Sequence, residues 1–169
     1  MSQRWLIKTP NPKFQRLLSD SLNIHPIIAQ LLVNRDITNV DLARQFLYAN
    51  VSQLHDPFTL KDMDKAIERI EKAKVNKESI LIFGDYDVDG VTSSALLQRL
   101  LKKLGIRAIN YIPHRMDEGY GLNHGIVEFA KDQGIHLMIT VDCGVTAFAE
   151  VQAINAAGID VIIIDHHEP

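Results

Sequence analysis

Residues 80–90 read Ile-Leu-Ile-Phe-Gly-Asp-Tyr-Asp-Val-Asp-Gly, so four apolar residues lead directly into three aspartates at alternate positions. The apolar run from Ile80 to Phe83 is typical of a strand that is covered on both faces. The segment from Val91 to Leu104 predicts a helix, which Gly105 ends. The aspartates therefore fall in a strand-to-helix turn, at the carboxyl edge where open α/β sheets bind ligands.

This acidic turn predicts a metal site. Packing Asp85, Asp87 and Asp89 within a few ångströms would raise some of their pKa values unless a cation neutralised them. An EF-hand loop shares these aspartates but needs a glutamate at its twelfth position, which is Leu96 here. The residues from Asp87 to Thr92 also match the opening of haloacid-dehalogenase-type phosphatases, whose first aspartate is a phosphoryl nucleophile. A solvated turn without a ligand is the remaining alternative.

The composition is that of an ordinary globular chain. Its 169 residues are 46% hydrophobic and 23% charged, which predicts one α/β domain with an appendage. The single cysteine cannot form an internal disulfide, and the sequence shows neither a signal peptide nor an apolar run long enough to span a bilayer. We therefore expect a cytoplasmic protein that does not bind membranes.

The charge is unevenly distributed along the chain. Residues 1–79 carry 12 basic and 9 acidic side chains, whereas residues 80–169 carry 6 basic and 12 acidic ones, so the net charges are +3 and −6. An isoelectric point near 6.1 gives no basic footprint for nucleic acid. Bound metals would invert the local potential of an acidic cleft, so charge alone argues neither for nor against DNA.

Residues 1–60 are expected to form a small helical appendage. Short helical patterns follow one another at residues 14–22, 26–34 and 41–49. Thr38 or Asn39 is a possible N-cap of the last one. A further helix over roughly residues 62–75 has apolar residues at helical spacing and should pack one face on the sheet.

From residue 61 onward, strand and helix patterns alternate. Strands are expected at residues 80–83, 107–112, 136–141 and 161–164, the last of them buried, and helices at 91–104, 123–133 and 146–157. Thr146 is a possible cap of the final helix. This alternation predicts an α/β fold with a doubly wound parallel sheet, built from right-handed crossovers and preceded by the helical appendage. The polar residues that follow the four strands should then meet at one edge.

The later turns add further candidate residues to that edge. They contain Pro113-His114-Arg115, Gly119-Tyr120-Gly121, Asp142-Cys143-Gly144 and Asp165-His166-His167. Carboxylates and imidazoles with a single thiol favour manganese or magnesium over structural zinc. A bridging carboxylate such as Asp142 would suit two ions about 3.5–4 Å apart.

The other side chains of these turns have simpler expected roles. At least one of His166 and His167 is expected to bind metal, because both directly follow an aspartate at the same edge. Cys143 is expected to be a small packing residue. The guanidinium of Arg115, with the backbone amides of Gly-Tyr-Gly nearby, suits a phosphate.

Together these motifs resemble the DHH phosphoesterase superfamily, which is named for the triplet found here as Asp165-His166-His167. Residues 84–90, 113–122 and 140–144 stand in the order and spacing of its bacterial single-stranded-DNA-specific exonucleases, and the resemblance covers the whole chain. It implies a Rossmann-like lobe. It also implies a nuclease that removes nucleotides from the 5′ end of single-stranded DNA in recombination and repair, using two manganese or magnesium ions.

The resemblance also assigns roles position by position. Metal ligation falls to Asp87, Asp89, Asp142 and His166, with Asp142 as the bridge. Asp85 and Asp165 are expected to act as auxiliary catalytic groups that orient the ligands. His167 is expected to face the scissile phosphate or the leaving group. Arg115 is expected to contact the 5′ phosphate, and Tyr120 to stack on a terminal base.

Proteins of this kind continue past Pro169, to a further metal-ligating aspartate and a second lobe. Residues 61–169 are therefore expected to be the first part of a catalytic domain that is truncated after the third motif, and this chain alone is expected to be inactive. Two alternatives stay open. One is a DHH phosphodiesterase or pyrophosphatase acting on short oligonucleotides or cyclic dinucleotides, and the other is a non-catalytic scaffold. The sequence identifies no protein partner.

Overall fold

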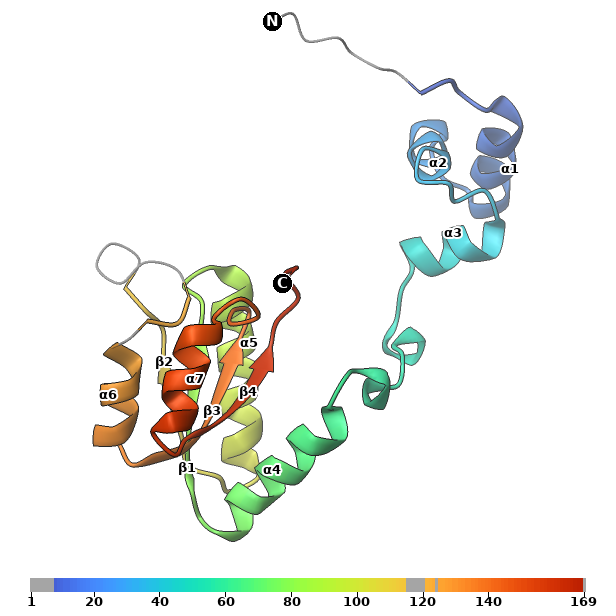
Figure 1. Cartoon of the computed structure of the whole chain (residues 1–169). Coiled ribbons are helices and arrows are strands. Elements are labelled where there is room, and N and C mark those ends of the chain that lie inside the picture. Colours follow the sequence, from blue (N-terminus) through green and yellow to red (C-terminus); the bar gives the residue numbers. More distant parts are fainter. Residues whose placement is uncertain (1–7, 115–120, 124, 169) are drawn as a thin grey trace, which may run out of the picture. The chain divides into compact units, whose positions relative to one another are not determined.

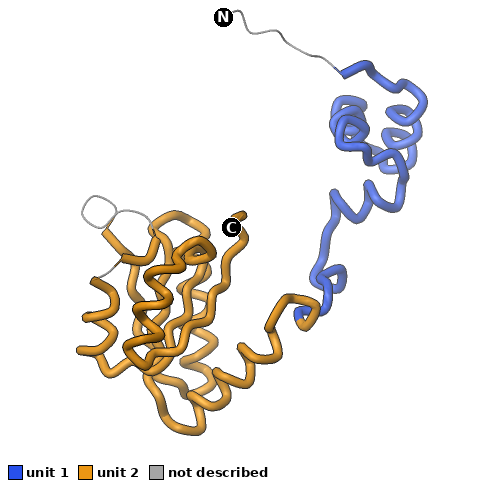
Figure 2. The backbone as a smooth tube through the Cα atoms, in the orientation of Figure 1, with its two compact units in different colours: residues 1–57 blue, residues 58–169 orange. Residues whose placement is uncertain are grey.

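The computed structural model describes residues 8–114, 121–123 and 125–168. The chain divides into two compact units, Met1–Pro57 and Phe58–Pro169, which Figure 2 shows in different colours. None of the described helices is both long and apolar enough to cross a bilayer.

The first unit contains three short helices with a core of their own. They are α1 (Pro12–Leu22), α2 (Pro26–Val33) and α3 (Val40–Leu47), followed by the 3-10 helices η1 (Val51–Gln53) and η2 (Pro57–Thr59). Their buried apolar side chains are Leu18, Leu22, Ala29, Leu32 and Ala43. Asn39, and not Thr38, caps α3, because its side chain accepts hydrogen bonds from the N–H groups of Asp41 at 2.7 Å and Leu42 at 3.2 Å. The predicted helical appendage is thus present.

The second unit is built on a four-stranded sheet (Figure 1). Its strands are β1 (Ser79–Gly84), β2 (Ala108–Tyr111), β3 (Ile135–Val141) and β4 (Asp160–Ile164). All of them run parallel, in the order β2-β1-β3-β4. β1 has β2 on one side and β3 with β4 on the other, so the sheet extends from β1 in both directions. This order confirms the doubly wound sheet that the alternation of strands and helices predicts.

Helices cover both faces of the sheet, which explains why β1 is apolar throughout. They are α5 (Val88–Lys103), α6 (Gly125–Asp132) and α7 (Phe148–Ala156). Leu81 and Phe83 belong to the core cluster that contains residues of α6 and α7. Ile80 and Ile82 point to the opposite face and pack in the cluster that contains Leu101 of α5. Successive residues of a strand point to opposite faces, so a central strand needs apolar residues at every position.

Three details of the prediction are wrong. β4 is not buried: Ile163 and Ile164 are 41% and 52% exposed, because among the described residues β4 pairs with β3 alone and forms the sheet edge. Thr146 does not cap α7, whose N-cap is Ala147. α5 begins at Val88, because the side chain of Asp87 accepts hydrogen bonds from the first N–H groups of the helix.

Helix α4 (Met63–Val75) precedes the sheet, and the side chains that it contributes to the core come from its second half. Ala73 is buried and Ile70 packs in the α5-side cluster, whereas Ile67 is 44% exposed. The predicted apolar face therefore contacts the core over only part of its length.

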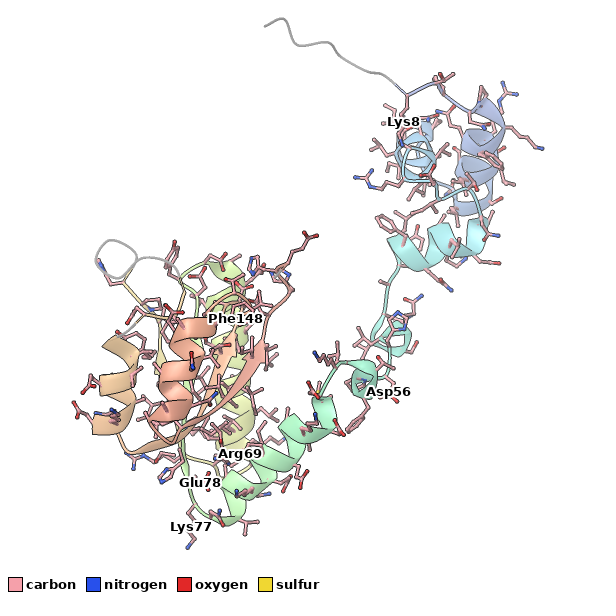
Figure 3. The ribbon with its side chains drawn as sticks, viewed as in Figure 1. Lys8, Asp56, Arg69, Lys77, Glu78 and Phe148 are labelled. Carbon is pink, nitrogen blue, oxygen red and sulfur yellow. The ribbon has the colours of Figure 1, made fainter. Side chains whose placement is uncertain are left out.

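A charged cluster attaches α4 to two strands. Arg69 pairs with Glu78, the residue before β1, at 2.7 Å, and with Asp160 of β4 at 2.5 Å. It also donates a hydrogen bond to the carbonyl oxygen of His136 at 3.2 Å. Arg69, in the middle of α4, and Glu78, which follows the helix, are labelled in Figure 3.

Candidate metal centre

The strand register brings acidic residues together at the carboxyl edge of the sheet. Gly84 at the end of β1 pairs with Val141 at the end of β3, and Val141 pairs with Ile164 at the end of β4. The residues that come next along the chain are Asp85, Asp142 and Asp165. The N–H of Asp142 continues the ladder by donating to the carbonyl oxygen of Ile164 at 2.9 Å. The predicted gathering of carboxylates therefore follows from the pairing of the three strands.

Three carboxylates form a first donor group. Ligand oxygens of Asp85, Asp87 and Asp142 all lie within 4.8 Å of one another. Asp85 is only 3% exposed, and its Oδ1 atom is buried without a hydrogen-bond partner among the described residues. A buried carboxylate oxygen left unpaired is costly, and coordination to a cation would satisfy it.

The negative charges within this group repel one another. Burial raises the pKa of Asp142, and the carboxylates of Asp87 and Asp89 raise it further. The pKa of Asp87 is lowered, chiefly because its carboxylate accepts a hydrogen bond from the N–H of Gly90 at 3.1 Å. A cation would relieve the repulsion that keeps the two neighbouring carboxylates from both being ionised.

A second donor group contains Asp142 again, together with His166 and His167. The Nε2 atom of His166 lies 3.0 Å from Oδ1 of Asp142. Asp142 is therefore common to both groups, which is the position that the predicted bridging ligand would occupy. Its backbone is left-handed, with φ at 64°, so the residue turns sharply out of β3.

Asp165 holds the ring of His167. Its Oδ1 atom lies 2.7 Å from Nδ1 of His167 and accepts a hydrogen bond from the backbone N–H of the same residue, while its Oδ2 atom accepts from the N–H of Val145 at 2.9 Å. Burial acts to raise the pKa of Asp165, but these N–H donors outweigh it, so the pKa lies below its usual range. The hydrogen bond to Asp165 raises the pKa of His167.

The remaining predicted residues stand as follows. Asp89 lies in the first turn of α5 and outside both donor groups, although its charge reaches Asp142. Cys143 is fully buried in the core, and burial raises the pKa of its thiol to about 12, so it packs as a neutral side chain. Arg115 and Tyr120 lie outside the described residues.

Sequence reasoning missed two buried hydroxyl groups near this edge. Ser94 on α5 is 1% exposed and Thr140 on β3 is fully buried, and neither hydroxyl oxygen has a hydrogen-bond partner in the described part of the chain. A polar residue on the sheet-facing side of a helix would have been the only signal for Ser94, and periodicity alone gives it little weight.

The donor set fits a hard divalent cation. It offers aspartate oxygens and imidazole nitrogens, with the one nearby thiol protonated and buried in the core. Carboxylate-rich sites of this kind suit manganese or magnesium. Two structural observations favour such an ion. They are the unpaired oxygen of Asp85 and the repulsion between the carboxylates of Asp87 and Asp142.

The chain also matches a family of known proteins. Residues 79–169 match the family model described as "DHH family, N-terminal domain". The single-stranded-DNA-specific exonuclease RecJ of Bacillus subtilis (strain 168) is 42% identical over 166 residues, which are 98% of this chain and 21% of that protein. The chain spans about a fifth to a quarter of the length of the curated relatives at the head of the comparison.

Two solved structures are similar to almost the whole chain. RecJ of Thermus thermophilus in complex with Mn²⁺ is 28% identical, with a TM-score of 0.69, and the match covers 96% of this chain and 22% of that one. The same protein in complex with Mg²⁺ is 25% identical, with a TM-score of 0.58, over 95% of this chain and 19% of that one. Both therefore share the fold described above.

Proposed function

The chain belongs to the DHH family, and from this premise we propose that it is the amino-terminal part of a metal-dependent, RecJ-like exonuclease. The whole protein would remove nucleotides from the 5′ end of single-stranded DNA in recombination and repair, working in the bacterial cytoplasm. The observation that carries the proposal is the pair of donor groups that share Asp142. The family match favours this reading over the EF-hand and haloacid-dehalogenase alternatives.

Some residues of the site would bind the metal ions, and others would transfer protons. Asp85, Asp87 and Asp142 would hold one Mn²⁺ or Mg²⁺ ion, and Asp142 with His166 would hold the other. Asp89 is proposed as a further ligand, as in the resemblance stated above. When bound, the ions supply Lewis-acid stabilisation of the phosphate and activation of water.

His167 is proposed to act on the leaving group. Asp165 fixes its ring through Nδ1 and its backbone N–H, so the imidazole has one orientation at the carboxyl edge. An imidazole held in this way can donate a proton to the oxygen that departs from phosphorus. Arg115 and Tyr120 keep the roles that the resemblance gives them, at the 5′ phosphate and the terminal base.

The test is an exonuclease assay on the full-length protein, with 5′-labelled single strands in a series of lengths and with Mn²⁺ present. The proposal expects progressive release of mononucleotides from long strands, and loss of this release in Asp142→Asn. Cleavage confined to dinucleotides or other very short substrates would instead favour a DHH phosphodiesterase. Absence of cleavage together with absence of Mn²⁺ binding would favour a non-catalytic scaffold.

A further inference from the structure

The end of β1 and the start of α5 lie very close together, because three small residues form the contact between them. Gly84 ends β1, Gly90 lies in the first turn of α5, and Ser94 lies one turn further along that helix. We name these residues the glycine–serine seam. All three are buried, and together they form the contact between the end of the strand and the start of the helix.

Gly90 admits no side chain. A Cβ atom at this position would lie 2.3 Å from the carbonyl oxygen of Asp85 and 2.6 Å from its backbone nitrogen. Real Cβ atoms essentially never come this close to backbone atoms. The first turn of α5 can therefore rest on the peptide of Asp85 only because residue 90 is glycine.

Gly84 and Ser94 make the second contact of the seam. A Cβ atom on Gly84 would lie 2.1 Å from the Oγ atom of Ser94 and 3.0 Å from the carbonyl oxygen of Gly90. The Ser94 hydroxyl thus occupies the space that a side chain on the strand would need. Its oxygen has no hydrogen-bond partner within the described ranges.

The seam lies between the two parts of the first donor group. The carboxylate of Asp87 accepts hydrogen bonds from the N–H groups of Asp89 and Gly90, at 3.0 and 3.1 Å, so it is fixed to the helix. Asp142 follows β3 and is fixed to the sheet. Any displacement of α5 from the end of β1 would therefore move Asp87 away from Asp142 and from the unpaired oxygen of Asp85.

We propose that the glycine–serine seam positions the metal-ligating carboxylates. It sets how closely Asp87, which is held by α5, approaches Asp142, which follows β3. This inference rests on the proposed function, because it assumes that the group binds a divalent cation. It assigns to Gly84 and Gly90 a positioning role that is separate from ligation, and Ser94 is the neighbour whose hydroxyl a side chain at position 84 would meet. Residues that support metal ligands typically change metal affinity by about ten- to a hundredfold when they are altered.

The test measures Mn²⁺ affinity by titration calorimetry on the purified chain, with circular dichroism to confirm folding. Gly90→Ala is expected to bind Mn²⁺ at least about tenfold more weakly than wild type. Leu101→Ala is the stability control, because Leu101 is a buried core residue of the same helix but lies outside the seam; it should lower the melting temperature and leave affinity unchanged. Asp142→Asn is the control for loss of a ligand.

A pair of variants tests the second contact and does not depend on whether Gly90→Ala folds. Gly84→Ala alone should weaken Mn²⁺ binding, because the new methyl group collides with the Ser94 hydroxyl. Gly84→Ala combined with Ser94→Ala removes that oxygen and should restore most of the affinity. Ser94→Ala alone should bind close to wild type.

The outcomes separate the two proposals. If wild type binds Mn²⁺ and Asp142→Asn does not, but Gly90→Ala or Gly84→Ala binds as tightly as wild type, the positioning role is wrong and the proposed function stands. A loss of affinity in Leu101→Ala equal to that in the seam variants would also overturn the positioning role. If wild type itself binds no Mn²⁺, the seam proposal fails, and the exonuclease assay on the full-length protein decides the proposed function separately.

Discussion

Asp142 is the residue on which both donor groups depend. It stands where β3 ends, in a left-handed conformation, and its carboxylate belongs both to the group with Asp85 and Asp87 and to the group with His166 and His167. The strand order makes this possible, because β3 lies between β1 and β4 and its end therefore neighbours both. A side chain in this position can contact ligands from both neighbouring turns.

Replacing Asp142 with asparagine should have opposite effects on stability and on metal binding. The amide keeps the shape of the side chain and removes its repulsion with Asp87, so the melting temperature without metal should rise by about 4 °C for a gain of about 1 kcal/mol. The stabilisation by Mn²⁺ that we expect of wild type should disappear. Thermal scans with and without Mn²⁺ measure both effects, with Asp132→Asn at an exposed site as the control. An Mn²⁺-dependent rise as large as that of wild type would contradict the shared role.

Asp165→Asn should separate catalysis from metal binding. The asparagine oxygen can still accept one hydrogen bond, but the charge that holds the ring of His167 is lost. In the full-length protein we expect kcat to fall by about ten- to a hundredfold, with Mn²⁺ affinity changed much less. Single-strand cleavage assays and calorimetry on the same variant test this prediction. Equal losses in both quantities would show that Asp165 acts mainly on the metal ligands.

The elements of the second unit show which parts of a fold can be predicted from sequence. β1 was predictable because a central strand is apolar at every position, and the acidic turns were predictable because parallel strands end at one edge. The exposure of β4 was not predictable, because its sequence, Asp160-Val-Ile-Ile-Ile164, is as apolar as that of a central strand. Edge position depends on strand order, which local sequence does not encode.

Part of the candidate site could also be predicted from the sequence. Spacing after each strand showed which residues meet, but it could not show that Asp85 would join the first donor group while Asp89 stays outside it. That difference comes from the start of α5 at Val88, which places Asp89 in the helix. The close approach at Gly90 was also hidden, because it depends on how the helix is seated on the strand.

The attachment of α4 should be sensitive to acid. The pKa of Glu78 lies below its usual value of 4.5, because its carboxylate accepts a hydrogen bond from Asn76 and, despite burial, pairs with Arg69. A group with a lowered pKa stabilises the fold above its unfolded-state pKa, and this contribution is lost as pH falls through the folded-state value. Wild type should therefore lose stability as pH falls below about 4.5.

Glu78→Gln tests this prediction. It should be less stable than wild type by about 1 kcal/mol at pH 7, and the difference should shrink as pH falls below 4.5. Urea unfolding at a series of pH values measures the effect. Glu71→Gln, at an exposed position of α4 itself, is the matched control and should show no such difference. A difference that stays constant with pH would rule out the charge of Glu78 as its source.

At the scale of the whole molecule, each unit carries its own core. The first unit buries side chains of α1, α2 and α3 among themselves, and the second buries both faces of its sheet. Two separate cores predict two independent folding units. All the described residues of the two donor groups lie in the second unit.

Removing residues 1–57 should therefore leave the second unit folded and able to bind Mn²⁺. We expect the shortened chain to show a single cooperative thermal transition and an Mn²⁺ affinity close to that of the chain of 169 residues. Circular dichroism and calorimetry on both proteins make the comparison. Loss of cooperative unfolding in the shortened chain would show that the sheet depends on the helical unit.

The exposed edge of β4 has a practical consequence for anyone who handles this chain at high concentration. Within the described residues no strand pairs with its outer side, so its backbone offers unpaired N–H and C=O groups beside the exposed side chain of Ile164. Such an edge is a template for strand addition by another molecule. We expect reversible self-association that grows with concentration, and Ile164→Lys should suppress it by placing a charge on the edge. Sedimentation at several concentrations measures the effect. Equal association by wild type and Ile164→Lys would show that another surface mediates it.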